Sequence, residues 1–261
     1  MQAKDIMKDA ITLETHNTLA DARDLMIRYN ISRILIVSNG KPVGIITEKS
    51  IGKFLLRDGR ALDELRLDQV MRRDLITVNE DASIETCAKL MIEHDISSLI
   101  VDSKARIFTK SDLVRVYAQL FKNKKRVREY MTENVYTLKS THSLHTVLSV
   151  MVKKKISRII VIKDSKPIGI ITARDLLPTS MLVEKEEEVT SGLTSNITHV
   201  LLAKDVMKKP LVINLDEDLA TAAQIMVEKR IGGLPTVDNN NDLRGVITKT
   251  DILRAIIDLN H

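Results

Sequence analysis

The chain lacks tryptophan and has one cysteine and few aromatic residues among its 261 residues. A lone Cys87 cannot form an internal disulfide, which is typical of a reducing compartment, so we expect a cytoplasmic protein. Because aromatic residues make up only 3% of the sequence, aliphatic side chains must supply most of the core. Apolar runs such as 34–37 are far shorter than the roughly 20 residues of a membrane helix, and the N-terminus has no signal-like apolar stretch. We therefore expect no membrane association.

One pattern of residues occurs four times along the chain. Each copy opens near a Met, has a second Met 19 or 20 residues later, and has an Ile five residues beyond that. A hydrophobic strand and a Thr follow. Repeats of about 60 residues that mix helix and strand are typical of small domains that pair. The Ile and Thr positions are Ile31, Ile96, Ile156 and Ile231, and Thr47, Thr109, Thr172 and Thr248.

Every copy predicts the element order β-α-β-β-α. A short amphipathic opening that ends in Met precedes a short strand and a helix whose apolar side chains recur at i, i+3 and i+7. Two continuously apolar strands joined by a turn come next, and a final helix begins at the Thr. The first helix should be capped by Thr18, Ser83, Ser143 or Asp218 in the respective copy. The fold class is therefore α/β, built from α+β repeats.

The repeat also predicts where the domains lie. We expect them over residues 1–57, 65–120, 125–180 and 201–258, with a polar linker over 181–200.

Strings at the end of three copies resemble the CBS domain, named after cystathionine β-synthase. They are Gly44-Ile45-Ile46-Thr47, Gly169-Ile170-Ile171-Thr172-Ala173-Arg174-Asp175 and Gly245-Val246-Ile247-Thr248-Lys249-Thr250-Asp251, with a weaker copy over 106–112. The resemblance covers nearly the whole chain. It implies that copies one and two, and copies three and four, form two Bateman modules that close into a flat disc, similar in layout to the gamma subunit of AMP-activated kinase. It also implies an adenosine-containing ligand, most simply AMP, ADP or ATP, in the clefts between paired domains.

The Thr-x-x-Asp string by itself is also a capping box that starts a helix. The resemblance adds ribose binding, and the two roles are compatible. A glycine before the strand could let a flat ligand approach the backbone. The implied ribose contacts are Thr172, Asp175, Thr248, Asp251, Thr109, Asp112 and Thr47, and the implied backbone or base contacts are Gly169, Gly245, Gly44, Ile156, Ile231, Leu234 and Pro235.

The copies differ at these positions. Ser50 replaces the Asp in copy one and Arg106 replaces the Gly in copy two, so we expect the C-terminal module, residues 127–261, to bind most tightly. Arg33 and Arg158 begin the second strand of copies one and three. They are either solvated charges at a strand end or phosphate contacts, and Arg174 is another phosphate candidate.

We find no sequence motif for catalysis. Walker loops and G-x-S-x-G strings are missing, Cys87 lies on an apolar helix stripe, and His142 and His145 lack further metal ligands. We therefore predict a non-catalytic regulatory sensor, without metal or cofactor, whose adenine nucleotide state is read by an unknown partner protein; a homodimer stays open. Two alternatives remain. One is nucleic-acid binding through the basic run 122–128, although a net charge of +5 is mild, and the other is S-adenosylmethionine or a dinucleotide as the ligand.

Overall fold

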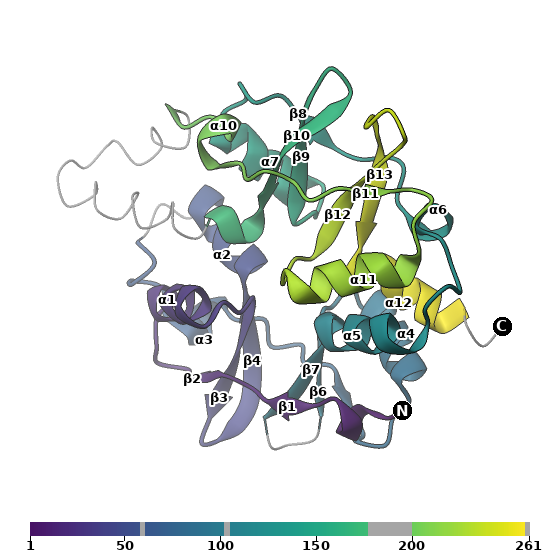
Figure 1. Cartoon of the computed structure of the whole chain (residues 1–261). Helices are drawn as coiled ribbons and strands as arrows, with labels where there is room; N and C mark the ends of the chain where they lie inside the picture. The colour runs from purple at the N-terminus through teal and green to yellow at the C-terminus, as the bar shows by residue number, and fades with distance from the viewer. Residues whose placement is uncertain (58–60, 102–104, 177–199, 259–261) are drawn as a thin grey trace.

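The four copies lie around one centre in the computed structural model, which describes residues 1–57, 61–101, 105–176 and 200–258 (Figure 1). The sheets of copies one and two occupy the lower half of this view, and those of copies three and four occupy the upper half. Apart from Val200, the predicted linker over 181–200 lies outside the described residues. Within the described residues, no helix is both long and apolar enough to cross a membrane.

Copies one and two have the predicted order of elements. In copy one these are β2 (Thr12–Glu14), α1 (Leu19–Tyr29), β3 (Arg33–Ser38), β4 (Lys41–Thr47) and α2 (Glu48–Arg57). In copy two they are β5 (Thr77–Val78), α4 (Ile84–Glu93), β6 (Ser98–Val101), β7 (Arg106–Thr109) and α5 (Lys110–Leu120).

Copies three and four repeat the same order. Copy three consists of β8 (Thr137–Leu138), α7 (Leu144–Lys153), β9 (Arg158–Lys163), β10 (Lys166–Thr172) and the 3₁₀ helix η2 (Ala173–Leu176), after which the chain leaves the described residues. Copy four consists of β11 (Ile213–Asn214), α11 (Leu219–Glu228), β12 (Gly233–Val237), β13 (Leu243–Thr248) and α12 (Lys249–Asp258). In every copy the middle strand pairs in parallel with the first strand and antiparallel with the third. The predicted fold class is confirmed.

Three of the four predicted helix caps are present. The hydroxyls of Thr18, Ser83 and Ser143 accept hydrogen bonds from the third helical amide over 3.2, 3.1 and 3.2 Å. The prediction was wrong for Asp218, whose side chain makes no capping bond. Its Oδ2 instead accepts a bond from the backbone amide of Asn123 at 3.0 Å, because the connection between copies two and three runs over this helix start.

The opening segments are exchanged between neighbouring copies. Each opening contains a short helix, η1 (Ala3–Asp5), α3 (Leu67–Val70), α6 (Val127–Tyr130) or α10 (Ala203–Val206). The first amide of each helix donates to a backbone oxygen of the partner copy, at Ala82, Asn17, Glu217 and His142 respectively, over 2.9, 2.8, 3.0 and 2.8 Å. Copies one and two therefore exchange openings, as do copies three and four, and we call these pairs the N-terminal and C-terminal modules.

The residue after each opening Met extends the exchange into a sheet. Lys8, in the short strand β1 (Lys8–Asp9), pairs with Ile107 of copy two. The equivalent bridges join Arg72 to Ile45, Thr132 to Val246 and Lys208 to Ile170. The opening of one copy thus borders the third strand of the other, directly before the Thr-x-x-Asp string.

The two modules meet in two different ways. Helices α11 and α12 of copy four pack on α4 and α5 of copy two, and the buried residues of these copies form one continuous apolar core. Copies one and three keep separate cores and meet where α2 contacts α7 and η2. One side of the molecule is therefore joined by shared apolar packing and the other by contact between separate domains.

Candidate functional site

Three buried carboxylates lie at the start of the last helical element in copies two, three and four. Their side chains are only 3%, 6% and 2% exposed for Asp112, Asp175 and Asp251. In each, Oδ2 accepts hydrogen bonds from both the amide and the hydroxyl of the Thr three residues earlier. The two distances are 2.9 and 2.7 Å from Thr109, 2.8 and 2.6 Å from Thr172, and 2.7 and 2.7 Å from Thr248. One oxygen of every carboxylate thus begins a helix.

The other oxygen, Oδ1, contacts cations that differ between the copies. Asp112 Oδ1 lies 3.0 Å from Lys8 Nζ and 3.2 Å from Arg115 Nη1, and Lys8 Nζ is also 3.2 Å from Oδ2. Asp175 Oδ1 lies 2.5 Å from Lys208 Nζ. Asp251 Oδ1 lies 2.8 Å from Arg254 Nη1. Both lysines belong to the opening of the partner copy, and Thr132 occupies their position beside copy four.

These contacts affect the acidity of the carboxylates in opposite directions. Burial by itself raises the pKa of Asp112, but hydrogen bonds from Thr109 and the charge of Lys8 outweigh it, and the net shift is downward. At Asp251 burial dominates over the Thr248 hydrogen bonds and the charges of Arg254 and Arg158, so its pKa is raised. Hydrogen bonds and nearby positive charges therefore offset the effect of burial on the pKa at Asp112 but not at Asp251.

Copy one has no carboxylate at this position, as its sequence predicts. Ser50 donates its amide to Thr47 Oγ1 at 3.3 Å, and the two hydroxyls lie 3.1 Å apart. This arrangement starts α2 but offers no charged acceptor.

Arg33 and Arg158 reach across their modules to the partner copy. Arg33 Nη1 donates to the backbone oxygen of Ser97, and Arg158 Nη1 donates to that of Gly232 at 2.6 Å. Burial lowers the pKa of both arginines to about 10, while the charges of Glu48 and then Asp112 on Arg33, and of Asp251 on Arg158, oppose the shift. Arg158, read from the sequence as part of copy three, therefore acts on the carboxylate of copy four. Arg33 acts in the same way on copy two.

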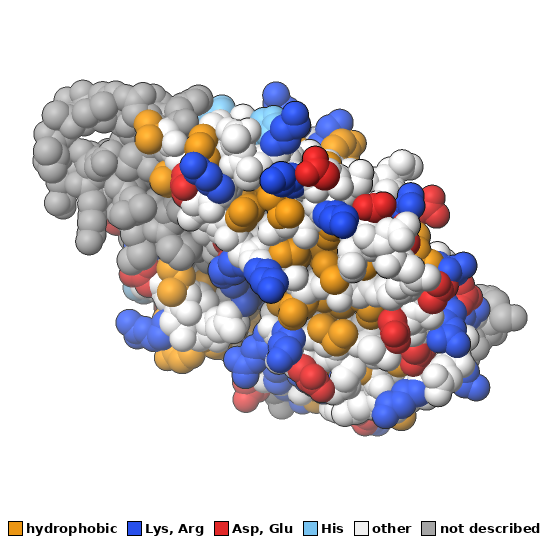
Figure 2. Space-filling model, turned by 45° about the horizontal axis from the view of Figure 1, so that its top comes forward, with side chains coloured by type: hydrophobic (Ala, Val, Ile, Leu, Met, Phe, Trp, Pro, Cys, Tyr) orange, Lys and Arg blue, Asp and Glu red, His pale blue; other side chains and the backbone are white. Residues whose placement is uncertain are grey.

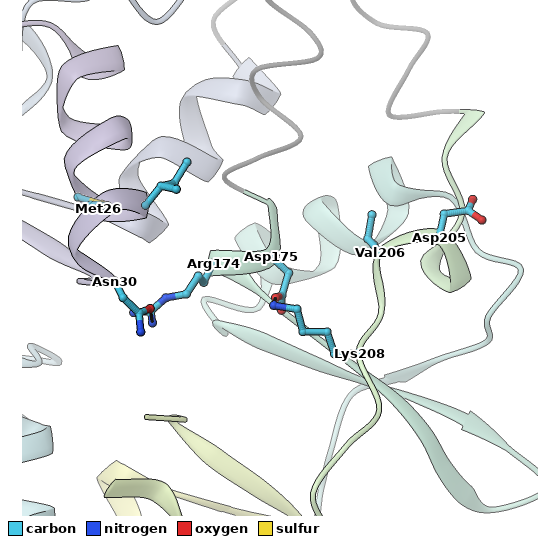
Figure 3. Close-up of a pocket in the computed structure, with 8 residues that line it drawn as sticks. Met26, Asn30, Arg174, Asp175, Asp205, Val206 and Lys208 are labelled. Carbon is cyan, nitrogen blue, oxygen red and sulfur yellow. Dashed lines mark hydrogen bonds and ion pairs between the residues drawn. The ribbon is translucent and has the colours of Figure 1, made fainter. Parts of the chain in front are cut away.

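The side chain of Arg174 forms part of the contact between the modules. Its Nε donates to Glu48 Oε1 of copy one at 2.6 Å, and its Nη1 donates to Asn30 Oδ1 (Figure 3). Burial raises the pKa of Glu48, and the charge and hydrogen bond of Arg174 act against that shift. A phosphate contact at Arg174 would have to share the guanidinium with copy one.

A cavity of about 360 Å³ lies beside Asp175. Its walls come from α1 of copy one, from η2 and from the opening of copy four, and Figure 3 shows Lys208 pointing at Asp175 from the opening side. A second cavity of about 470 Å³, between the start of β4 and residues 73–77, contains none of the predicted ligand contacts. The residues that line the cavity beside Asp175 are Met26, Ile27, Asn30, Arg174, Asp175, Asp205, Val206 and Lys208.

Two lysines near the molecular centre were missed by the sequence reasoning. Lys110 Nζ donates to Thr250 Oγ1 at 2.8 Å, and Lys249 Nζ donates to Ser111 Oγ at 2.7 Å, so α5 and α12 exchange equivalent bonds. Burial lowers the pKa of both lysines to about 8, and Arg33, Arg158 and Arg174 add to the effect at Lys249. The available signal was the Lys that directly follows Thr109 and Thr248. We call Arg33, Lys110, Arg158, Arg174 and Lys249 the central cations.

The predicted glycine contacts are occupied by protein. A Cβ on Gly44 would lie 2.3 Å from Met71 Sδ, and one on Gly169 would lie 2.4 Å from Met207 Sδ. A Cβ on Gly245 would lie 2.7 Å from the backbone oxygen of Thr132. The glycines therefore make room for the opening of the partner copy, and their approach to a ligand stays a prediction.

The predicted base contacts lie in different surroundings. Leu234 is fully buried in the core shared by copies two and four. Its neighbour Pro235 is also buried and, because successive strand residues face opposite sides, lies on the other face of β12. Ile156 and Ile231 are partly buried and pack against the cores of their own copies.

The family is decided by its match to four stretches of the chain. The CBS domain matches residues 3–57, 67–119, 127–180 and 203–258. This chain belongs to the CBS family. Short connecting stretches are all that separate the four CBS domains.

Similar proteins agree with that assignment. The uncharacterised protein MJ1225 of Methanocaldococcus jannaschii is 26% identical over 267 residues, covering 95% of each chain. Its crystal structure, described as that of a candidate archaeal homologue of g-AMPK, has a TM-score of 0.88 at 24% identity and covers 98% of this chain and 100% of that one. A conserved protein from Pyrococcus horikoshii has a TM-score of 0.68 at 21% identity, with 98% and 100% covered. These likenesses confirm the predicted four-domain layout.

Half of the chain also resembles part of an enzyme. The inosine-5'-monophosphate dehydrogenase of Thermoplasma acidophilum is 31% identical over 135 residues, which is 52% of this chain but 24% of that protein. The four CBS domains here contain no triad of His, Cys, Asp or Glu side chains that could bind a metal within the described residues. Cys87 is fully buried, and burial raises the pKa of its thiol to about 11, so this sulfur is a core atom.

Two arginines of the basic run 122–128 contact copy four, and one lysine contacts the following helix α6. Arg128 pairs with Asp216, Arg126 Nη1 donates to the Asp216 backbone oxygen at 3.2 Å, and Lys125 lies 3.8 Å from Glu129. On the face shown in Figure 2, basic and acidic side chains are interspersed. The run therefore serves contacts within the C-terminal module, which weakens the nucleic-acid alternative.

Proposed function

We propose that this CBS protein is a non-catalytic cytoplasmic sensor that binds adenine nucleotides between its paired domains and presents the bound state to a partner protein. The observation that carries the proposal is the position of Arg158 of copy three at the helix start of copy four. Its Nη1 donates to the Gly232 oxygen at 2.6 Å, the next residue, Gly233, pairs with Thr248, and Arg158 and Asp251 act on each other's pKa. A carboxylate suits a ribose diol, and a guanidinium suits a phosphate. The two groups come from different domains of one module, so a nucleotide that contacts both joins the domains.

The central cations support a phosphate-bearing ligand over a neutral one. Arg158, Lys249 and Arg33 are partly or largely buried, and after burial itself the charges of Arg33 and Arg158 lower the pKa of Lys249. Arg33 also has a buried Nε with no acceptor among the described residues. Buried donors and buried like charges are costly, and an incoming phosphate would relieve both costs. AMP, ADP and ATP therefore fit better than adenosine alone.

The proposed contacts follow the geometry of the modules. In the C-terminal module, Thr248 and Asp251 face Arg158, and we propose that this site binds most tightly. In the N-terminal module, Asp112 and Thr109 face Arg33 but Asp112 already contacts two cations. Asp175, which accepts two bonds from Thr172, lines the cavity that also touches copy one. Thr47 belongs to a neutral and weaker site.

Ligand binding can change the protein only by favouring one arrangement of the domains over another. Arg174 offers the link, because it is next to Asp175 and bonds Glu48 and Asn30 of copy one. A nucleotide phosphate that competes for Arg174 would loosen copy one from copy three. The partner protein would then read the relative position of the two modules.

Thermal unfolding with added nucleotides tests the proposal. A ligand that binds only the folded state stabilises it by about 2.7 kcal/mol at 100 times its dissociation constant. We expect AMP, ADP or ATP to raise the melting temperature saturably, and GMP at equal concentration to do so much less. Stabilisation by S-adenosylmethionine but not by AMP would support the alternative ligand. No shift with any adenosine compound at millimolar concentration would contradict the proposal.

A further inference from the structure

The ribose carboxylates differ in how many acceptor positions remain open. Each carboxylate oxygen has two lone pairs. In Asp112, Asp175 and Asp251 the amide and hydroxyl of the preceding Thr both donate to Oδ2 and use its two lone pairs, and at Asp112 Lys8 Nζ also lies 3.2 Å from this oxygen. Only Oδ1 can therefore accept hydroxyl groups from a ribose without breaking the start of the helix.

The opening lysines contact this remaining oxygen. Lys8 Nζ contacts both oxygens of Asp112, at 3.0 Å from Oδ1 and 3.2 Å from Oδ2, and Arg115 donates to Oδ1 as well. Lys208 uses one lone pair of Asp175 Oδ1 and lies in the wall of the adjoining cavity (Figure 3). Among the described residues, Asp251 Oδ1 contacts Arg254, one turn further along its own helix, and so also has one lone pair in use. No cation reaches this oxygen from the described opening of the partner copy, because Thr132 takes the place of the lysine. The lysine is thus the donor that distinguishes the sites.

The lysine contacts can open. The side chains of Lys8 and Lys208 are 55% and 70% exposed, although their carboxylate partners are buried. Ion pairs with one exposed and mobile member contribute little, about 1 kcal/mol at most, which corresponds to about a fivefold change in affinity. Their backbones are held by the bridges to Ile107 and Ile170, so the ammonium group returns to the same carboxylate when the ribose leaves.

We propose that Lys8 and Lys208 determine which CBS sites accept a ribose, each by contacting Oδ1 of the carboxylate from the opening of the partner copy, whereas Thr132 brings no cation to Asp251 from that side. This inference rests on the proposed function and deepens it. The ligand class is any ribonucleoside with free 2'- and 3'-hydroxyls. A ribose at Asp175 must first displace Lys208, and a ribose at Asp112 must displace Lys8.

Exchanging the two residue types gives a direct test. In a chain carrying Asp112→Asn and Asp251→Asn, Asp175 is the remaining charged ribose site, and Lys208→Thr should raise its adenosine affinity about two- to fivefold. In a chain carrying Asp112→Asn and Asp175→Asn, Thr132→Lys should lower adenosine affinity by a similar factor. Adenosine has no phosphate, so loss of a lysine charge does not weaken a phosphate contact.

Two controls separate the proposed contact from other effects. Lys209→Thr removes the neighbouring exposed lysine and should leave adenosine affinity unchanged. Binding of 2',3'-dideoxyadenosine, which lacks the diol, should not respond to Lys208→Thr. Calorimetric titration measures the affinity of each parent chain and each variant for adenosine, and the affinity for 2',3'-dideoxyadenosine with and without Lys208→Thr.

The outcomes distinguish this inference from the proposed function. If both parent chains bind adenosine but neither exchange changes the affinity, the lysine proposal is wrong and the sensor proposal stands. Weaker adenosine binding after Lys208→Thr would also overturn it, because the lysine would then contact the ligand. If the wild-type chain binds no adenosine compound at all, both proposals fail together.

Discussion

The two oxygens of each aspartate in the Thr-x-x-Asp string make different contacts. Oδ2 of Asp251 caps the helix through Thr248, while Oδ1 faces Arg254. The sequence predicts the capping box, which the structure confirms, and the ribose contact stays a proposal that would fall on the other oxygen. Sequence reasoning also places the residues correctly along the chain, but it could not assign Arg158 to copy four, because that contact depends on how two domains pair.

The buried lysines predict a dependence of stability on pH. Burial lowers the pKa of Lys249 from 10.5 to about 8 in the folded state. The unfolded chain keeps this proton to higher pH, so the free energy of unfolding should rise between about pH 8 and pH 10.5. Urea unfolding at pH 7.5 and 9.5 should show that Lys249→Met removes roughly 1 to 2 kcal/mol of this rise.

An exposed lysine provides the control for that measurement. Lys89 is 68% exposed on α4, and Lys89→Met should leave the pH dependence as in the wild type. An identical rise in the Lys249→Met protein would show that this ammonium group is better solvated than the structure indicates.

At the scale of elements, the opening segments decide how the copies join. The recurring Met and Gly are explained together, because Met71 and Met207 pack where a side chain on Gly44 or Gly169 would lie. The sequence repeat predicts that the openings exist, yet it cannot predict that they are exchanged. An opening packed on its own copy and one packed on the partner have the same sequence, and only the length and direction of the connections select between them.

The glycines should differ in their tolerance of alanine. On Gly169 the new methyl group meets the flexible Met207 side chain, whereas on Gly245 it meets the Thr132 backbone oxygen. That oxygen accepts a 2.9 Å bond from the Val246 amide and cannot move without breaking the bridge. We expect Gly245→Ala to destabilise the fold by about 2–3 kcal/mol and Gly169→Ala by about 1 kcal/mol, measured by chemical unfolding. Equal effects would mean that the exchanged openings can shift as whole segments.

The whole molecule is asymmetric, although its four domains are alike. Copies two and four share an apolar core, while copies one and three are linked by polar contacts such as Arg174 with Glu48. The sequence predicts four domains in two modules, because the repeat is strong. It could not predict this asymmetry, since the apolar faces of α5 and α12 read as ordinary amphipathic helices until their packing partners are known.

This asymmetry predicts where the molecule opens. Glu48→Gln removes the charge that Arg174 contacts, and α1, α2 and η2 should then exchange amide hydrogens faster, while α5 and α12 remain protected. Hydrogen–deuterium exchange with mass spectrometry measures this peptide by peptide. Glu93→Gln, which removes an exposed carboxylate beside Lys89, is the matched control and should change neither side. Equal acceleration in copies one and three and in copies two and four would contradict a weaker contact between copies one and three.

Calorimetric titration of AMP into the wild-type protein and into Asp251→Asn tests the central claim most directly. Asparagine keeps an oxygen that can accept the Thr248 bonds, so the fold should lose about 1 kcal/mol or less. It lacks the charge that strengthens a bond to a ribose hydroxyl, worth about 1.5–3 kcal/mol, so affinity at the tightest site should fall roughly tenfold or more. Unchanged AMP affinity in the Asp251→Asn protein would mean that the string from Thr248 to Asp251 starts a helix and binds no nucleotide.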